Sequence, residues 1–507
     1  MNLKTDIMPN ALILKENYEK LIKVGKALTA EKDYNKLLEL ILNETRKIAK
    51  ADGGTLYIID DGKLYHKIMQ NETLKIFLGG GGEPINFKPL ELVETHIAPY
   101  TAIHKKPVNI PDVYHTELFD FTGPKEFDKS VGYITKSMLV VPLINRDDDV
   151  IGVVQLINAV ENNELVPFSH DIEEIVMTLS SQAGIALENM QYVDEIRTLF
   201  DSFVAVLVTA IDERTPYNAN HSRNVAIFTE RFARAVNDYK EGPYGDFIFD
   251  EAHIRTLVMA AWLHDIGKIT VPESVMNKPT RLSTDIEFVE NRIKLIKALV
   301  DQRYYKTLAN CERTETEKQS AKALWVLEKE FIEEATALII KANEPSTFMD
   351  AKMQSEIVKI YEYRFEAVEE SLLNQREFEF LMIQKGTLTD GEREIMENHV
   401  VTTEKMLSKI KFPKDLNEVP YWAINHHEML DGTGYSRGLK EAEIPMEVRI
   451  LTIIDIYDAL TATDRPYKKG MPADKAFFIL GKMVEEGKID GDLLYIFEHS
   501  EAWHFKN

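Results

Sequence analysis

The sequence predicts a multidomain chain in which an α+β domain precedes an all-α helical bundle domain that carries a helical insertion. The length of 507 residues fits two or three domains. Short apolar runs of strand type occur only in the part before about residue 190. From residue 213 onward, apolar residues recur at helical spacing nearly throughout.

The composition excludes several kinds of protein. Apolar residues make up 44% of the chain and charged residues 28%, as in a soluble globular protein. The 60 basic and 83 acidic residues give a net charge of −23, which argues against a nucleic-acid polymer as partner. The single cysteine, Cys311, leaves only His, Asp and Glu as strong metal ligands. We see no signal peptide and no apolar run long enough to cross a membrane, so we expect a cytoplasmic protein without membrane contact.

The first half alternates between helical and strand patterns. Leu38 and Leu42 belong to an apolar helix face, and a polar turn at 145–149 joins two apolar runs into a hairpin. The expected helices are 11–31, 32–50 and 169–190, and the expected strands are 55–60, 137–144 and 150–158.

Residues 32–190 resemble a GAF domain. The resemblance rests on the strands SMLVVPL and IGVVQLIN, on Phe168, and on the helix LSSQAGIALENMQ. It implies a sensor domain that binds an unknown small ligand and regulates the second half of the chain. Members that bind cyclic nucleotides carry an Asn-Lys pair and a later Asp-Glu pair. Here Ala159 follows Asn158 and Ile172 occupies the Asp position, which argues against a cyclic nucleotide as ligand.

The linker at 191–212 has the pattern of a short coiled coil. Its apolar residues are spaced alternately by three and four: Val193, Ile196, Phe200, Phe203, Leu207 and Ala210. One interpretation is a parallel dimer helix that carries a signal, so that the chain forms a homodimer through its GAF domain and linker helices. The other is a helix packed on its own domain.

The second half places His and Asp at unusual positions. An apolar run over 257–263 leads directly into His264 and Asp265, and burying both would be costly unless they were paired or bound a metal. The i, i+4 spacing places Lys268 on the same helical face as His264. Imidazole with carboxylate suits iron, manganese, nickel or zinc. The other candidates, each expected on a helix or at its end, are His221, His399, His426, His427 and Asp455.

Together these segments resemble an HD-GYP phosphodiesterase, a subgroup of the HD phosphohydrolase superfamily. The resemblance covers about 201–284 and 385–475. The matching segments are HDIGK, PESVMNKP, TLTDGEREIMENH, HHEMLDGTGY and IPMEVRILTIIDIYDALTATDRPYKK, with His221 before them. The resemblance implies metal-dependent hydrolysis of cyclic di-GMP, or a related 3′,3′ cyclic dinucleotide, to the linear dinucleotide pGpG, to GMP, or to both.

The resemblance also implies a ligand set for two metal ions, iron or manganese. One would be held by His221, His264, Asp265 and Asp455. The other would be held by Asp265, His399, His426 and His427. Asp265 would bridge the two ions, and Lys268 would act with it in catalysis.

Further roles carry over by position. Arg465 and Lys468 would meet the substrate phosphates, and Gly432, Gly434 and Tyr435 would form a loop over a guanine. Glu428 and Asp431 are expected to orient the His ligands through hydrogen bonds; the alternative is that they are solvated loop acids.

The sequence departs from the family pattern in four places. Ser436 replaces the Pro of the GYP motif, Tyr217 replaces the Glu of members with a third metal, and Asn224 replaces an Arg. An insertion of about 285–384 interrupts the domain. We expect it to form helices over 286–307, 316–342 and 351–374, with a buried stripe of Val326, Phe331, Ile332, Ala335 and Ile339. It is either a helical decoration or dimer surface, or a lid that narrows substrate choice.

The expected organisation is an N-terminal helix at 1–31, the GAF domain at 32–190, the linker at 191–212 and the phosphodiesterase domain at 213–507. The leading hypothesis is a GAF-regulated, two-metal cyclic di-GMP phosphodiesterase. Two alternatives stay open. One is an HD-type enzyme acting on another nucleotide, such as 3′,3′-cyclic GMP-AMP or a nucleotide monophosphate. The other is a non-catalytic receptor for a cyclic dinucleotide.

Overall fold

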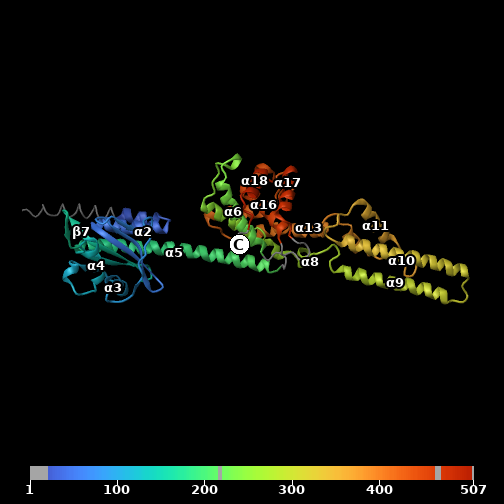
Figure 1. Cartoon of the computed structure of the whole chain (residues 1–507), viewed down its shortest axis with the longest axis horizontal. Helices are drawn as coiled ribbons and strands as arrows, with labels where there is room; N and C mark the ends of the chain where they lie inside the picture. The colour runs from blue at the N-terminus through green and yellow to red at the C-terminus, as the bar shows by residue number, and fades with distance from the viewer. Residues whose placement is uncertain (1–20, 215–219, 463–469, 505–507) are drawn as a thin grey trace, which may run out of the picture. The chain divides into compact units, whose positions relative to one another are not determined.

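The structure of the chain is a computed structural model that describes residues 21–214, 220–462 and 470–504. It divides into two compact units, Met1–Phe200 and Asp201–Asn507 (Figure 1). Part of the first expected helix, together with Tyr217, Arg465 and Lys468, lies outside the described residues. Among the described residues, no helix is long and apolar enough to cross a bilayer.

An eight-stranded antiparallel sheet is the centre of the first unit. Its order is β3-β2-β1-β7-β6-β5, with β4 paired to β2 and β8 paired to β7. The expected hairpin is β6 and β7, which pair from Met138↔Ile157 to Ile144↔Val150. The strands are β1 (Ala51–Asp60), β2 (Lys63–Asn71), β3 (Ile76–Leu78), β4 (Leu90–Glu91), β5 (Val108–Ile110), β6 (Met138–Ile144), β7 (Val150–Glu161) and β8 (Glu164–Val166).

Helices cover both faces of this sheet because side chains alternate between the two faces along each strand. On one face, Leu38 and Leu42 of α2 pack against Leu156 and against α5. On the other face, α3 packs over Tyr57 and Val153 (Figure 1). The helical elements are the helix at 21–30, α2 (Tyr34–Ala49), α3 (Ile97–His104), η1 (Val113–His115), α4 (Thr122–Val131) and α5 (His170–Asp212). The predicted α+β architecture of this half is confirmed.

The helix α5 is 43 residues long and includes the whole predicted linker. Of the predicted seam, Ile196 is 65% exposed and Phe203 is 64% exposed. Val204 and Val208, which are not seam residues, are buried instead. The seam therefore faces solvent in the single chain, and the dimer helix remains a prediction.

The described part of the second unit consists of helices joined by loops, with no strand longer than an isolated bridge, which confirms the predicted all-α class. Its aromatic core joins α6, α16 and α18: the ring centroids of Phe228 and Tyr457 are 5.9 Å apart, and those of Phe232 and Phe497 are 4.9 Å apart. Outside the insertion the elements are α6 (His221–Asp238), η2 (Gly242–Tyr244), α7 (Glu251–Leu263), η3 (Ile266–Thr270), α8 (Glu273–Met276), α13 (Asp390–Glu397), α14 (His399–Leu407), η4 (Lys414–Leu416), α15 (Val419–Ile424), η5 (Glu441–Glu443), α16 (Met446–Thr461), α17 (Ala473–Glu485) and α18 (Gly491–His499).

The insertion is a long helical hairpin with a core of its own (Figure 1). Its helices are α9 (Asp285–Ala309), α10 (Glu315–Asn343), α11 (Ala351–Glu362) and α12 (Gln375–Leu381). The prediction that the third helix runs to 374 is wrong. It ends at Glu362, and a turn closed by a bridge between Phe365 and Glu370 comes next, because this turn buries Phe365 in the insertion core.

The predicted buried stripe of α10 is correct at Ile332, Ala335 and Ile339 and wrong at Val326, which is 38% exposed. Phe331 is partly buried against the same core. Trp325 takes the inward position instead, since its ring stacks on Tyr304 of α9 at 4.6 Å.

Arg281 fastens the base of the insertion. Its side chain is fully buried, and its guanidinium donates to the carbonyls of Ala342 and Glu344 at 2.5 and 2.7 Å and of Ile383 at 3.0 Å. These carbonyls lie on segments far apart in the sequence, so a single side chain joins the start, the middle and the end of the insertion.

Candidate metal centre

The segment after α7 brings its polar residues inward through a tight turn. α7 ends at Leu263, His264 caps it, and the 3-10 helix η3 begins at Ile266. Gly267 is required there, because a Cβ at this position would collide with the carbonyl of His399 and with Thr403. The Thr403 hydroxyl donates to the carbonyl of His264 at 3.2 Å and accepts from the Gly267 N–H at 3.0 Å. Close contact between η3 and α14 therefore fixes the turn.

This turn corrects the helical-face argument for Lys268. The α-helix does not continue through Lys268, so the i, i+4 spacing does not place Lys268 beside His264. On η3, Lys268 instead forms an ion pair with Asp265.

The other candidate residues come from four separate elements. His221 is the first residue of α6, and Asp455 lies within α16. His426 and His427 lie in the turn after α15. His399 is the first residue of α14, which begins just after α13 ends at Glu397.

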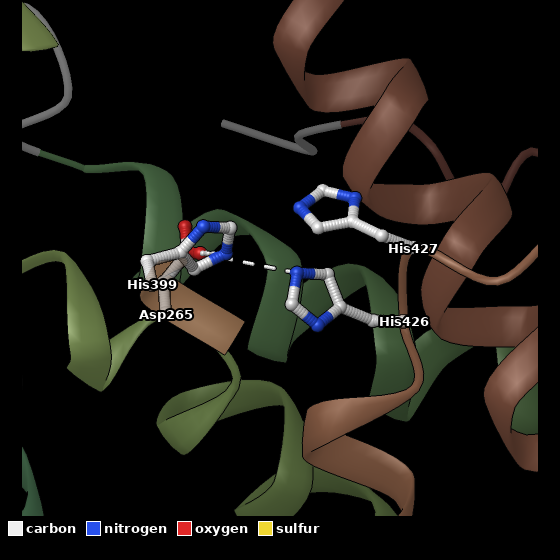
Figure 2. Close-up of side chains that lie close together, drawn as sticks. All are labelled: Asp265, His399, His426 and His427. Atoms are coloured by element: carbon white, nitrogen blue, oxygen red, sulfur yellow. Dashed lines mark ion pairs between the residues drawn. The ribbon is translucent and has the colours of Figure 1, made fainter. Parts of the chain in front are cut away.

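The structure gathers these residues into two adjacent groups with Asp265 between them. Asp265 Oδ2 lies 3.2 Å from His264 Nε2 and 3.4 Å from His221 Nε2. Its other oxygen, Oδ1, lies 3.2 Å from His399 Nε2 and 3.9 Å from His426 Nε2 (Figure 2). Within each group the potential ligand atoms are within 4.8 Å of one another; the groups are Asp265, His399, His426 and His427, and His221, His264 and Asp455.

The backbone fixes how three of the imidazoles are turned. His264, His399 and His426 each have Nδ1 within hydrogen-bond distance of the carbonyl three residues earlier, at 2.6, 2.7 and 2.6 Å. A carbonyl can only accept, so Nδ1 carries the proton and Nε2 keeps its lone pair in the neutral ring.

Several of these inward atoms are buried without a hydrogen-bond partner among the described residues. They are Nε2 of His221, His264, His399 and His426, and Oδ1 of Asp265. Buried polar atoms normally have a partner, so five unpartnered atoms at one place fit a bound cation. The donor set of imidazole and carboxylate is suitable for a metal ion.

Asp458 and Asn224 complete the environment of His221, and the sequence reasoning missed Asp458. Asp458 is buried, and its Oδ2 accepts from His221 Nδ1 at 2.7 Å. Its Oδ1 accepts from the amide of Asn224 at 3.1 Å. Asn224 stands where the family carries Arg, and the structure places it behind the site, against Asp458. The available signal was the spacing of Asp458, one helical turn after Asp455.

Charges in the site favour the metal-binding protonation state at Asp265, His426 and His427, but not at His221. Burial opposes the charge of Asp265, but His264 and Lys268 hold its pKa well below the usual value. Burial lowers the pKa of His427 to about 3 and that of His426 well below its usual value, so both rings are neutral near pH 7. Burial also opposes the charge of His221, yet the carboxylates around it raise its pKa well above the usual value. A cation that binds His221 must therefore displace a proton.

The expectation that Glu428 and Asp431 orient the His ligands is wrong. The buried carboxylate of Glu428 accepts from the backbone N–H groups of Arg437 and Leu439 at 2.7 and 2.8 Å, so it holds the next loop instead. Asp431 is an exposed loop acid that accepts from the N–H and hydroxyl of Thr433, which matches the alternative interpretation.

The loop after His427 lies against the cluster. Gly434 has no room for a side chain, because a Cβ would approach the backbone of Glu428. Gly432 has φ of +83°, a conformation that favours glycine. The ring of Tyr435 lies 4.6 Å from that of His427. Tyr435 therefore covers one side of the cluster.

Family models match both halves of the chain. The GAF domain model matches residues 33–187, and two HD domain models match residues 218–369 and 378–493. A solved GAF domain from an Acinetobacter phosphoenolpyruvate-protein phosphotransferase covers 36% of this chain and 98% of that chain, at 17% identity and a TM-score of 0.28. By the family models, the chain contains a GAF domain and an HD domain.

Curated relatives include phosphodiesterases of cyclic dinucleotides. The 3'3'-cGAMP-specific phosphodiesterase 3 of Vibrio cholerae is 42% identical over 311 residues, which is 61% of this chain and 40% of that protein. The cyclic di-GMP phosphodiesterase of Thermotoga maritima is 40% identical over 97 residues, 19% of this chain and 26% of that protein. The 3'3'-cGAMP-specific phosphodiesterase 1 of Vibrio cholerae is 30% identical over 128 residues, 25% of this chain and 29% of that protein. The chain spans less than half the length of each of these relatives.

Proposed function

We propose that this chain, a protein with a GAF domain and an HD domain, is an HD-GYP phosphodiesterase that hydrolyses a cyclic dinucleotide with two metal ions. The observation that carries the proposal is the cluster around Asp265, in which buried Nε2 atoms and a carboxylate oxygen converge without partners among the described residues. The names of the relatives support the reaction class.

The two groups suggest how two ions would be held. His221, His264, Asp265 and Asp455 would bind one ion, and Asp265, His399, His426 and His427 the other, with Asp265 shared. Iron or manganese is proposed, because imidazole and carboxylate together suit these ions. When bound, a pair of such ions supplies an activated water and neutralises phosphate charge.

Among the residues of the chain itself, we assign Lys268 to a phosphate oxygen of the substrate. Its side chain is 19% exposed and pairs with Asp265, so it lies at the edge of the cluster. A compact ammonium of this kind stabilises charge that develops on a non-bridging oxygen. Arg465 and Lys468 would meet the other phosphate.

Gly432, Gly434 and Tyr435 would form the substrate-facing loop. The packing of Tyr435 on His427 supports a role in shielding the cluster from bulk water, beside the guanine contact that the resemblance implies. Glu428 holds the end of this loop by its two backbone hydrogen bonds.

Two substrates remain candidates. Cyclic di-GMP follows from the HD-GYP resemblance. The match over 311 residues is to a protein named for 3′,3′-cyclic GMP-AMP, and this favours the mixed dinucleotide as the second candidate. The products would be a linear dinucleotide, mononucleotides, or both. The single cysteine and the nucleotide substrate make the cytoplasm the proposed location.

We assign regulation to the GAF domain, acting through α5. The last residue of α5, Asp212, accepts from the hydroxyl of Ser222 at 3.0 Å, and Ser222 directly follows His221. Arg214 donates to the carbonyl of Ile269, next to Lys268. A shift at the end of α5 would therefore reach two residues of the cluster. The exposed seam of α5 is proposed as the homodimer contact.

The test combines metal analysis with turnover. We expect the full chain, purified without oxygen, to contain two metal ions and to hydrolyse cyclic di-GMP or 3′,3′-cyclic GMP-AMP. Asp265→Asn should lose both properties, whereas Asp431→Asn, the same chemical change on the exposed loop acid, should keep both. If Asp265→Asn retained its metal and its turnover, the proposal would be wrong.

A further inference from the structure

A cavity of about 450 Å³ lies in the first unit, away from the metal cluster. One wall is the sheet face formed by β1, β2, β6 and β7, and the other includes α4 and residues 87–90. This volume falls in the range of small-molecule sites in proteins. The cavity belongs to the face opposite α2 and α5.

Aromatic rings form one side of the cavity and its mouth. The rings of Tyr57 and His66 have centroids 4.7 Å apart, and those of His66 and Phe87 are 5.3 Å apart. Phe87 is 51% exposed, and Phe127 of α4, which also lines the cavity, is 44% exposed. A flat apolar ligand would cover both exposed rings and stack against this wall.

One amide side chain defines the polar contact that the cavity can offer. The carbonyl oxygen of Gln155 accepts from the Tyr57 hydroxyl at 3.3 Å, which leaves its NH₂ group to donate to a ligand. The side chain of Gln70 lies on the opposite face of the sheet, where it accepts from Arg46 of α2 at 2.8 Å. Nδ1 of His66 is also buried without a partner among the described residues. The complementary ligand therefore has ring nitrogens or carbonyl oxygens along its edge.

The lining has little charge. Burial lowers the pKa of His66 and raises the pKa values of Tyr57 and Tyr133, so these rings are neutral near pH 7. Of the described residues that line the cavity, Lys88 alone carries a full charge, and it is exposed. A phosphate or carboxylate of a ligand buried in the cavity would need a cationic partner that is closer and less hydrated than the exposed ammonium of Lys88.

Asn158, the residue of the cyclic-nucleotide pattern that this chain retains, serves the backbone instead. Its side chain accepts from the N–H of Lys136 at 2.7 Å and donates to the carbonyl of Ile134 at 2.7 Å.

We propose that this cavity binds a neutral, planar heteroaromatic molecule with hydrogen-bond acceptors on its edge, and that this molecule is the regulatory ligand of the GAF domain. Stacking of the ligand against the aromatic side chains of the wall and the mouth supplies the affinity, and the NH₂ group of Gln155 supplies the orientation. Binding here is independent of the metal cluster, so the ligand class can be tested whether or not the proposed hydrolysis is correct.

Calorimetry on the metal-free full chain tests the proposal with matched probes. Adenine and lumichrome are neutral planar heterocycles, and cyclic AMP carries the same base as adenine with an anionic phosphate. We expect saturable binding of adenine or lumichrome at one site per chain, and cyclic AMP binding at least about tenfold more weakly than adenine. Equal or tighter binding of cyclic AMP would overturn the proposal, and so would the absence of saturable binding by either neutral probe up to about 1 mM.

Variants locate the binding. Gln155→Leu should weaken the neutral probe about tenfold or more, whereas the same change at the exposed Gln319 of the insertion should leave it unchanged. Phe87→Ala, at a half-exposed position, is the second variant if Gln155→Leu does not fold, as judged by thermal unfolding. Unchanged affinity in a folded Gln155→Leu or Phe87→Ala protein would place the probe elsewhere and contradict the proposal.

Discussion

Replacing Asp458 with Asn should weaken metal binding although Asp458 is not a proposed ligand. The carboxylate accepts from His221 Nδ1 at 2.7 Å and from Asn224 at 3.1 Å, and it is 2% exposed. This contact fixes the ring of His221 and keeps the proton on Nδ1, which leaves Nε2 for the cation. The amide of Asn lacks the charge, and in one orientation it presents NH₂ to Nδ1, which would force the proton onto Nε2.

The expected magnitude is a loss of about 10- to 100-fold in metal affinity, or about 1.4 to 2.7 kcal/mol. The assay is a titration of the metal-free full chain with Mn²⁺ in competition with a chelating indicator. Asn224→Ala should have a smaller effect, because Asn224 contacts Asp458 and not His221. Asp474→Asn, at an exposed site on α17, is the matched control. An affinity of Asp458→Asn within about twofold of the control would refute this reasoning.

Three further changes probe other parts of the second unit. Gly267→Ala should destabilise the fold by about 1 to 3 kcal/mol, because its Cβ would meet the carbonyl of His399; an unchanged thermal midpoint would contradict the close approach. Glu428→Gln should raise KM while metal content stays the same, since one of its two loop hydrogen bonds loses its acceptor; loss of metal would instead show that it supports the ligands. Asp212 has its pKa raised by burial to about 6 from 3.8, so folding of the metal-free protein should lose stability as the pH rises from about 4 to 6. Asp212→Asn should therefore raise the thermal midpoint at pH 7 and have little effect at pH 4, and an equal shift at both pH values would show that ionisation is not the cause.

The sequence predicted those features that depend on residue type and local periodicity. The β6–β7 hairpin arises from two apolar runs around a polar turn, and it appears with the expected ends. The residues of the metal cluster were also named from the sequence, because five His and two Asp side chains stand on predicted helices or at their ends and match the motifs of the family. The structure brings all of them together.

The errors arise where tertiary contacts override a regular helix. The i, i+4 rule failed at Lys268 because close packing of Gly267 against α14 accompanies a change from α-helix to 3-10 helix. The third helix of the insertion ended early because Phe365 enters the core from a turn closed by a bridge to Glu370. The role of Asp458 could not be read from the sequence, since its partner His221 lies 237 positions away.

The most direct test of the central claim is a crystal structure of the full chain, purified without oxygen, with anomalous scattering recorded at the iron and manganese edges. Our account predicts two anomalous peaks, one on each side of the Asp265 carboxylate, the first among His221, His264 and Asp455 and the second among His399, His426 and His427. A single peak, or peaks that do not contact Asp265, would contradict the two-metal site.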